Sequence, residues 1–142
     1  MASTPKHSVS VAGVVVDDQN RVLVIRRDDN GHWEPPGGVL ELNESIEEGV
    51  RREVFEETGV AIEVERLTGV YKNITHGIVA LVFRCIAIHG DGHPTNEARE
   101  VRWMSTDEVQ DSMDPAFAVR ILDAFSDEPQ IRTHDGVNLV HS

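Results

Sequence analysis

The strongest constraint on the fold is a helix whose two ends are both marked in the sequence, from Ser45 to Gly59. Ser45 and Glu48 form a capping box, in which the Ser45 hydroxyl can accept from the backbone of Glu48 while the Glu48 carboxylate reaches back. Gly59 can adopt the left-handed conformation that commonly ends a helix. Because β-rich runs lie on both sides of this helix, the sequence predicts an α/β domain built on a mixed sheet.

The β-rich runs contain Val, Ile, Leu, Tyr and Phe and are bounded by turn residues. Residues 8–16 and 21–27 are separated by a turn-forming Asp-Asp-Gln-Asn cluster and predict a hairpin. Residues 60–73 and 78–88 predict a second hairpin, turning at 73–77.

Shorter elements are expected in the last third of the chain. We expect a strand at 100–104, a second capping box at 105–108, and a final helix from Asp-Pro at 114–115 to about Phe125. Residues 127–142 are interpreted as either a C-terminal tail or a late strand. One domain over 1–142 is the expectation for a chain of this length.

Composition excludes some classes of function. The formal net charge of −12 disfavours a broad surface for a nucleic acid polymer. No apolar run is long enough for a membrane span, so we expect no membrane partner and a cytoplasmic location. The single cysteine, Cys85, lies in an apparent strand and is interpreted as a buried hydrophobe rather than a nucleophile.

The predicted helix places acidic residues beside its apolar stripe. The stripe that should pack on the sheet consists of Ile46, Val50 and Val54. At helical spacing, Glu53, Glu56 and Glu57 share one side of the helix, and this side overlaps the stripe. Gly49 lies nearby and is expected to leave open space beside Glu53 and Glu56.

Carboxylates crowded against a core-facing stripe are unfavourable unless another group neutralises their charge. They repel one another, and desolvation raises the pKa of each. A bound Mg²⁺ would supply that compensation, since it prefers carboxylate oxygens and completes its octahedron with water and phosphate oxygens. The alternative is a solvated, glutamate-rich helix face with no ligand.

Around this helix the sequence resembles the Nudix family. The family box has the pattern G-x5-E-x7-R-E-U-x-E-E-x-G-U, in which U is aliphatic. Its fixed positions are filled by Gly38, Glu44, Arg52, Glu53, Val54, Glu56, Glu57, Gly59 and Val60. The segment 33–38, WEPPGG, also resembles the family's common Pro-Gly-Gly lead-in.

The resemblance implies a fold, a reaction and a set of site residues. Family members are α/β/α sandwiches with a central mixed sheet, and they hydrolyse nucleoside diphosphates linked to another moiety X. The metal ligands implied for Mg²⁺, or for Mn²⁺ in its place, are Glu53, Glu56, Glu57 and the Gly38 carbonyl. Arg52 would orient a catalytic carboxylate, and Glu44 would lie close to the metal cluster at the start of the helix.

Further site residues are expected outside the box. Many family members add a glutamate, often the general base, shortly before a Trp-bearing strand; Glu97 and Glu100 precede Trp103, and the spacing of Glu97 is closer to that of the MutT-type enzymes. Arg27 resembles a phosphate-contacting arginine of those enzymes, with a plain surface charge as its alternative. Trp33 is interpreted as either a platform for a base or a packing residue.

The substrate is approached by elimination. The markers of the ADP-ribose and dinucleoside polyphosphate types are absent at Thr75, His76 and Gly77. This leaves a MutT-like activity on nucleoside or deoxynucleoside triphosphates, with a nucleotide sugar or other diphosphate as the alternative. A non-catalytic nucleotide-sensing module and a prenyl diphosphate isomerase are the rival classes. The expected partner is a small nucleotide, and a homodimer is possible on the same resemblance.

Overall fold

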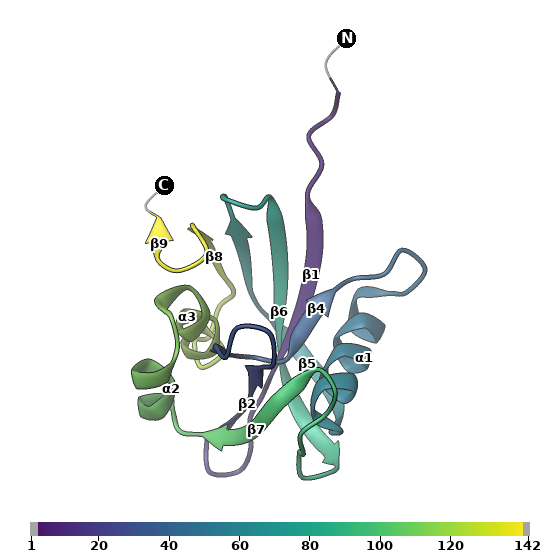
Figure 1. Ribbon diagram of the computed structural model, residues 1–142, viewed down its shortest axis with the longest axis vertical. Helices are drawn as coiled ribbons and strands as arrows, with labels where there is room; N and C mark the ends of the chain where they lie inside the picture. The colour runs from purple at the N-terminus through teal and green to yellow at the C-terminus, as the bar shows by residue number, and fades with distance from the viewer. Residues whose placement is uncertain (1–2, 141–142) are drawn as a thin grey trace.

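The chain forms two sheets and three helices over residues 3–140, the part described by the computed structural model (Figure 1). The elements are β1 (Ser8–Val15), β2 (Val22–Arg27), β3 (Trp33–Glu34), β4 (Gly37–Val39), α1 (Ile46–Thr58), β5 (Ala61–Asn73), β6 (Ile78–His89), β7 (Ala98–Met104), α2 (Thr106–Ser112), α3 (Pro115–Asp123), β8 (Gln130–His134) and β9 (Leu139–Val140). The larger, mixed sheet has the order β4-β1-β6-β5-β8-β9, and the smaller sheet has the order β3-β2-β7.

The helices cover opposite faces of the larger sheet, as Figure 1 shows with α1 on one side and α2 and α3 on the other. Alternating side chains of β1 explain this arrangement. Val11 and Val15 pack with α1 in one hydrophobic cluster, whereas Ala12 and Val14 pack in a second cluster with α2 and α3. Because side chains alternate across a strand, one buried strand serves both cores. These layers confirm the predicted α/β/α sandwich.

Helix α1 begins and ends where the sequence predicts. The Ser45 hydroxyl accepts from the Glu48 backbone nitrogen at 3.2 Å, and Gly59 has the left-handed φ of 76°. Within the described residues the return contact from the Glu48 carboxylate is not formed; the second capping box, Ser105 with Glu108, is complete. Ile46 is 41% exposed, so its predicted place in the packed stripe is wrong, while Val50 and Val54 are fully buried.

The predicted hairpin between the first two strands is wrong. Strand β1 pairs with β4 and with β6, and β2 pairs with β3 and β7. A single bridge, Val16 to Val22, joins the two segments. Both strands are buried along most of their length, so each is more stable with a partner on either side than as one half of an exposed hairpin. The turn therefore carries the chain from one sheet to the other.

The second hairpin, β5 with β6, is confirmed, as is a strand ahead of the second capping box. The last segment is a strand rather than a tail within the described residues, because β8 pairs in parallel with β5. Positions 141–142 of that segment, and 1–2 of the expected domain, lie outside the described residues. Cys85 is buried, as predicted, and burial raises the pKa of its thiol to about 12. Over residues 3–140, none of the helices has both the length and the apolar character that crossing a membrane requires.

Candidate active site

Two carboxylates of α1 lie on its buried side. Glu53 is 8% exposed and Glu57 is 5% exposed, beside the fully buried Val50 and Val54. Glu56 is exposed at the edge of the same group. The overlap of acidic and apolar positions predicted by helical spacing is therefore present in the fold.

The segment between β6 and β7 brings another carboxylate, Glu97, to this helix. Oxygen atoms of Glu53, Glu56 and Glu97 all lie within 4.8 Å of one another. The loop that carries Glu97 is fixed by Thr95, whose hydroxyl accepts from the Glu97 backbone nitrogen at 3.2 Å and donates to the Glu57 carbonyl at 3.1 Å. The arrangement of three carboxylates is therefore anchored at the C-terminal end of α1. It has the oxygen chemistry that a hard divalent cation requires.

Glu57 is held by the backbone of β4. Its Oε1 accepts from the Gly37 backbone nitrogen at 2.6 Å. The pKa of Glu57 is raised to about 8, mainly by burial and in part by the charges of Glu53, Glu34 and Glu97, against the opposing effect of the Gly37 hydrogen bond. Burial likewise raises the pKa of Glu53, which Arg52 opposes. A bound cation would relieve the same repulsion that a proton relieves here.

Gly38 has no room for a side chain. A Cβ on this residue would lie 2.5 Å from Oε2 of Glu53. The glycine therefore allows β4 to pass directly over the carboxylate, which places its backbone at the group that Glu53 forms with Glu56 and Glu97.

Arg52 connects the start of α1 to these carboxylates. Its Nη1 donates to Glu53 at 2.8 Å and to Glu56 at 3.3 Å, while Nε and Nη2 donate to the two oxygens of Glu44 at 2.9 and 2.6 Å. This fork, together with a hydrogen bond from the Glu41 backbone nitrogen, lowers the pKa of Glu44 to about 2. Glu44 thus positions Arg52, and Arg52 positions Glu53.

The space expected beside Gly49 is not open. A Cβ there would lie 2.6 Å from Leu40 Cδ1 and 3.0 Å from Glu44 Oε1. The prediction that Gly49 leaves room beside Glu53 and Glu56 is wrong. The glycine instead lets Leu40 and Glu44 close against the helix.

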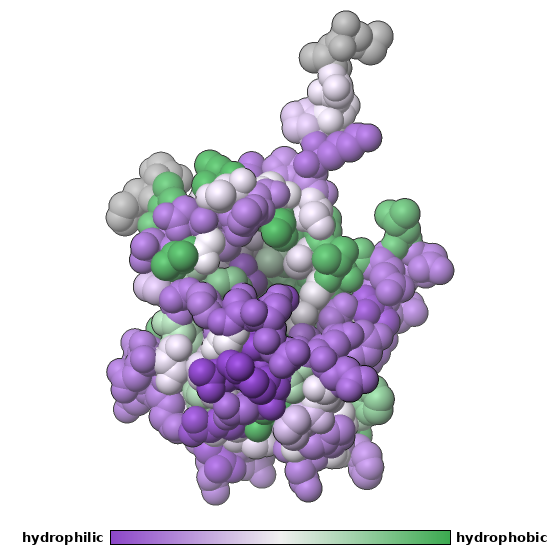
Figure 2. Space-filling view, viewed as in Figure 1, coloured by the Kyte–Doolittle hydropathy of each residue, from purple (hydrophilic) through white to green (hydrophobic). Residues whose placement is uncertain are grey.

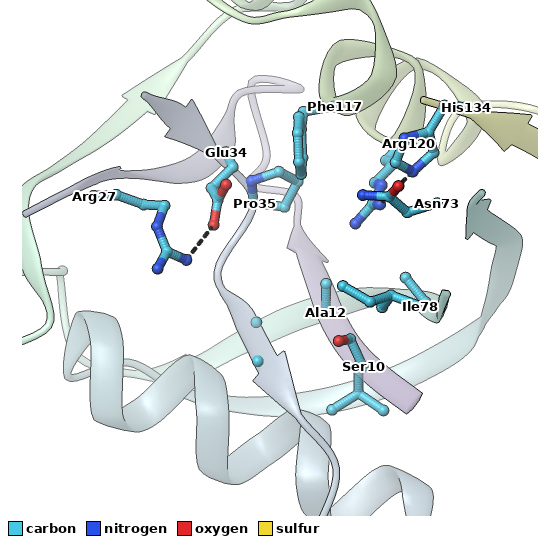
Figure 3. A pocket seen from close by; sticks show the side chains of 14 residues that line it. Ser10, Ala12, Arg27, Glu34, Pro35, Asn73, Ile78, Phe117, Arg120 and His134 are labelled. Atoms are coloured by element: carbon cyan, nitrogen blue, oxygen red, sulfur yellow. Dashed lines mark hydrogen bonds and ion pairs between the residues drawn. The ribbon is translucent and has the colours of Figure 1, made fainter. Parts of the chain in front are cut away.

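A cavity of about 200 Å³ lies in the same part of the molecule, and Figure 3 shows its lining residues from close by. Its walls come from β1, the Arg27 and Glu34 region, β4, the β5–β6 turn region, α3 and β8. They consist of Ser10, Val11, Ala12, Arg27, Glu34, Pro35, Gly37, Gly38, Asn73, Ile78, Ala80, Phe117, Arg120 and His134. Gly37 and Gly38 belong both to this wall and to the surroundings of Glu57 and Glu53, so the cavity and the carboxylate group meet at these two glycines.

Arg27 lies in the cavity wall, at the end of β2. Its Nη1 donates to Glu34 at 3.1 Å, and its Nε and Nη2 donate to the two oxygens of Asp29 at 2.8 Å. Glu34 is largely buried, and this burial raises its pKa against the opposing effect of Arg27. The carboxylates of Glu34 and Asp29 therefore hold the Arg27 guanidinium in the cavity wall.

Two other candidates lie away from the carboxylate group. Trp33 stands between two guanidinium groups, with Arg26 at 5.8 Å and Arg102 at 5.6 Å from its ring centroid, and the cavity walls come from other residues. Glu100 pairs with Arg26 at 3.0 Å across the smaller sheet. The structure thus brings Glu97, and not Glu100, to Glu53.

Several cavity residues have no counterpart among the sequence candidates. They are Glu34, Asn73, Phe117, Arg120 and His134. Glu34 had a usable signal, because it is an acidic residue beside the Pro-Pro-Gly-Gly segment. The others come from three distant segments, and their meeting depends on the parallel pairing of β8 with β5.

Comparison with known proteins places this geometry in a family. The model of the NUDIX domain matches residues 6–125. A MutT-like protein of Streptomyces ambofaciens is 56% identical over 97% of this chain and 90% of its own length. An ADP-ribose pyrophosphatase of Methanocaldococcus jannaschii is 34% identical over 68% of this chain and 60% of its own length.

Solved structures agree on the fold. A NUDIX hydrolase from Nitrosomonas europaea superposes with a TM-score of 0.78 at 24% identity, over 93% of this chain and 82% of its own. The resemblance drawn from the box is confirmed by the family match and by these relatives. The chain belongs to the Nudix family and is a hydrolase of the pyrophosphatase type.

Proposed function

We propose that the protein hydrolyses a phosphoanhydride bond in a nucleoside diphosphate linked to X with Mg²⁺ as cofactor, and that Mn²⁺ can substitute. The preferred substrate class is a nucleoside or deoxynucleoside triphosphate. The observation that carries the proposal is the meeting of Glu53, Glu56 and Glu97 oxygens within 4.8 Å, near a cavity whose wall includes Gly38, the residue packed against Glu53.

The residues present fit a divalent cation. Glu53, Glu56 and Glu57 offer carboxylate oxygens, the Gly38 carbonyl is a further candidate ligand, and burial makes an uncompensated negative charge on Glu53 and Glu57 costly. When bound, Mg²⁺ would lower the pKa of a water and neutralise charge on the phosphate oxygens.

The chain's own residues then have distinct roles. Glu97, exposed and adjacent to Glu53, accepts the proton of the attacking water. Arg52 holds Glu53 in place, and Glu44 holds Arg52. Arg27 faces the cavity and contacts the phosphates of the substrate.

Trp33 has a weaker case as a substrate contact. Its ring is already flanked by Arg26 and Arg102, which supports packing over stacking on a base. We therefore assign it a packing role in β3, next to Glu34.

A second substrate class deserves one arm of the test. The relative from Methanocaldococcus jannaschii is named an ADP-ribose pyrophosphatase, so a nucleotide linked to a sugar is the alternative. A purely nucleotide-sensing module is disfavoured because the box carboxylates are all present, and two of them, Glu53 and Glu56, lie together with Glu97.

The test is turnover of a panel of nucleoside triphosphates, deoxynucleoside triphosphates, oxidised deoxynucleotides, ADP-ribose and nucleotide sugars with Mg²⁺, with products resolved by chromatography. We expect a nucleoside monophosphate and pyrophosphate from the triphosphates. Glu53→Gln and Glu57→Gln should abolish this, and Glu48→Gln, on the exposed side of the same helix, should not. No turnover across the panel, or full turnover by Glu53→Gln, would overturn the proposal.

A further inference from the structure

The cavity wall contains a buried arginine without an acidic hydrogen-bond partner. Arg120, on α3, is 9% exposed, and Figure 3 shows its side chain reaching into the cavity beside Asn73 and His134. Within residues 3–140 its Nε is a buried polar atom with no hydrogen-bond partner. Leaving such a donor unpaired costs about 1–3 kcal/mol, and more when the group is charged.

Nearby carboxylates are engaged elsewhere. Asp123 accepts from Tyr71 at 2.8 Å and from both ends of the Arg132 fork at 2.7 and 2.9 Å. Glu34 accepts from Arg27. Arg120 instead lies over the rings of Phe117 and Tyr71, at 4.8 and 5.2 Å. These contacts stabilise its charge, but they give the Nε–H no acceptor within the described residues.

His134 adds to the excess of donors. Its Nε2 lies 3.2 Å from Arg120 Nη2, and its Nδ1 faces the Gly136 backbone N–H at 3.0 Å. Burial, and then the charge of Arg120, lower the pKa of His134, which keeps the ring neutral. A neutral imidazole has one acceptor nitrogen and one N–H, so it can satisfy only one of these two donors.

Asn73 presents a donor to the same space. Its Oδ1 accepts from the backbone nitrogens of Thr75 and His76 at 3.0 and 3.2 Å. The amide nitrogen is consequently the group left for the cavity, of which Asn73 forms part of the wall. Arg120, His134 and Asn73 thus bring N–H groups to one part of the cavity wall, and the Arg120 Nε–H among them has no acceptor within the described residues.

The rest of the wall selects the kind of acceptor. Ala12, Ile78, Ala80 and Phe117 make much of the lining apolar, which suits a flat ring better than a hydrated anion. The cavity wall also includes Gly37 and Gly38, where the phosphates of a substrate would meet the carboxylate group.

We propose that Arg120, Asn73 and His134 form a specificity subsite that binds a ring oxo group of the substrate's base, so that 6-oxopurine and 4-oxopyrimidine nucleotides are preferred over their amino counterparts. This inference rests on the proposed function, because it places the base by placing the phosphates at Glu53. An amino group in the same position is itself a donor and would face the N–H donors of the subsite. A site built to donate to an oxo group therefore strongly rejects the amino analogue.

Two pairs of nucleotides exchange this oxo group for an amino group, together with the N–H at the adjacent ring nitrogen: ITP with ATP, and UTP with CTP. We expect kcat/KM to favour ITP over ATP and UTP over CTP by roughly tenfold or more. Arg120→Met should reduce each ratio to within about threefold, while Arg66→Met, which removes an arginine that binds the Ala124 and Ser126 carbonyls, should keep the ratios. Equal rates within each pair in the wild type, or unchanged ratios in Arg120→Met, would overturn the subsite.

A measurement on the wild type covers the case in which Arg120→Met does not fold. In a ¹H–¹⁵N spectrum of the arginine side chains, IMP should shift the Arg120 Nε–H resonance and AMP should shift it far less. Identical shifts would show that the oxo group is not distinguished, and no shift would show that the base does not reach this guanidinium; either result would overturn the subsite. A terminal phosphate, as the other source of acceptor oxygens, is tested with inorganic phosphate, which should leave the resonance in place.

The two proposals fail in different ways. Turnover of nucleotides without a preference within either pair would defeat the subsite and leave the hydrolase intact. Selective binding of IMP without turnover of any triphosphate would defeat the hydrolase and leave the subsite.

Discussion

Glu57 accepts a 2.6 Å hydrogen bond from the backbone nitrogen of Gly37, and this contact fixes the buried side of α1 to strand β4. The next residue, Gly38, lies so close to Glu53 that a Cβ would collide with its carboxylate. The adjacent residues Gly37 and Gly38 therefore hold the carboxylates of Glu57 and Glu53 in place. The consequence is a pair of carboxylates held in low exposure, where a negative charge is costly without a counter-ion.

The raised pKa of Glu57 predicts a stability that depends on pH. Its pKa is about 8 in the folded chain against an ordinary 4.5, so the folded state holds a proton that the unfolded state loses. This contribution to stability is complete below pH 4.5, falls as pH rises, and is lost above about pH 8. Thermal melts in EDTA should therefore show that Tm decreases by about 5 °C or more between pH 4.5 and about pH 8.

The control for this pH effect is on the same helix. Glu57→Gln should remove the decrease, and Glu48→Gln, on the exposed side, should preserve it. Added Mg²⁺ should restore Tm above pH 8 in the wild type, because a cation replaces the proton. A wild type and Glu57→Gln with parallel pH profiles would contradict this account.

Glu97 and Glu100 provide a matched pair for the role of general base. Glu97→Gln should lower kcat by about 10²–10⁴-fold, the range for loss of a positioned base. Glu100→Gln should lower it little, because Glu100 pairs with Arg26 on the smaller sheet. The measurement is kcat against pH at saturating Mg²⁺. If the two variants are equally impaired, the assignment of Glu97 is wrong.

Arg52 and Glu44 should act through Glu53 rather than on the substrate. Arg52→Lys loses the fork that grips Glu44 at 2.9 and 2.6 Å, and Glu44→Gln weakens the same fork. Each should raise the Mg²⁺ concentration needed for half-maximal activity by roughly 10–100-fold, as loss of a supporting residue does in metal sites. An unchanged Mg²⁺ requirement in both variants would show that the fork is only structural.

Substituting Gly77 and Gly59, which both have a left-handed φ, distinguishes the cost of backbone strain from the cost of a steric collision. Gly77 has a φ of +64° and open space around its missing Cβ, so Gly77→Ala should destabilise by about 1–2 kcal/mol from conformation alone. Gly59 has a φ of +76°, and a Cβ there would also collide with the His93 ring, so Gly59→Ala should cost more. Urea denaturation of both variants checks the order, and equal losses would show that His93 moves aside freely.

The sequence predicts most of α1 because its signals are local. Ser45 as N-cap, Gly59 as C-cap and the burial of Glu53 and Glu57 all follow from residues within one helix. Ile46 departs from the pattern: it is the first residue of the helix, and its side chain is 41% exposed.

Strand pairing and the cavity depend on contacts between distant segments. Residues 8–16 and 21–27 look like a hairpin locally, but β1 gains β4 and β6 as neighbours, and no local pattern encodes that choice. Arg120 and His134 meet because β8 pairs with β5, and the sequence around each one reads as an ordinary helix and an ordinary polar segment. Glu97 could be placed only with the spacing known from the family.

The most direct test of the central claim is the position of Mn²⁺ in a crystal soaked with that ion. An anomalous peak should lie about 2.1 Å from carboxylate oxygens of Glu53 and of Glu56 or Glu57, and it should disappear in crystals of Glu53→Gln. A peak bound elsewhere, or one that persists unchanged in Glu53→Gln, would contradict the assignment of these carboxylates as the metal site.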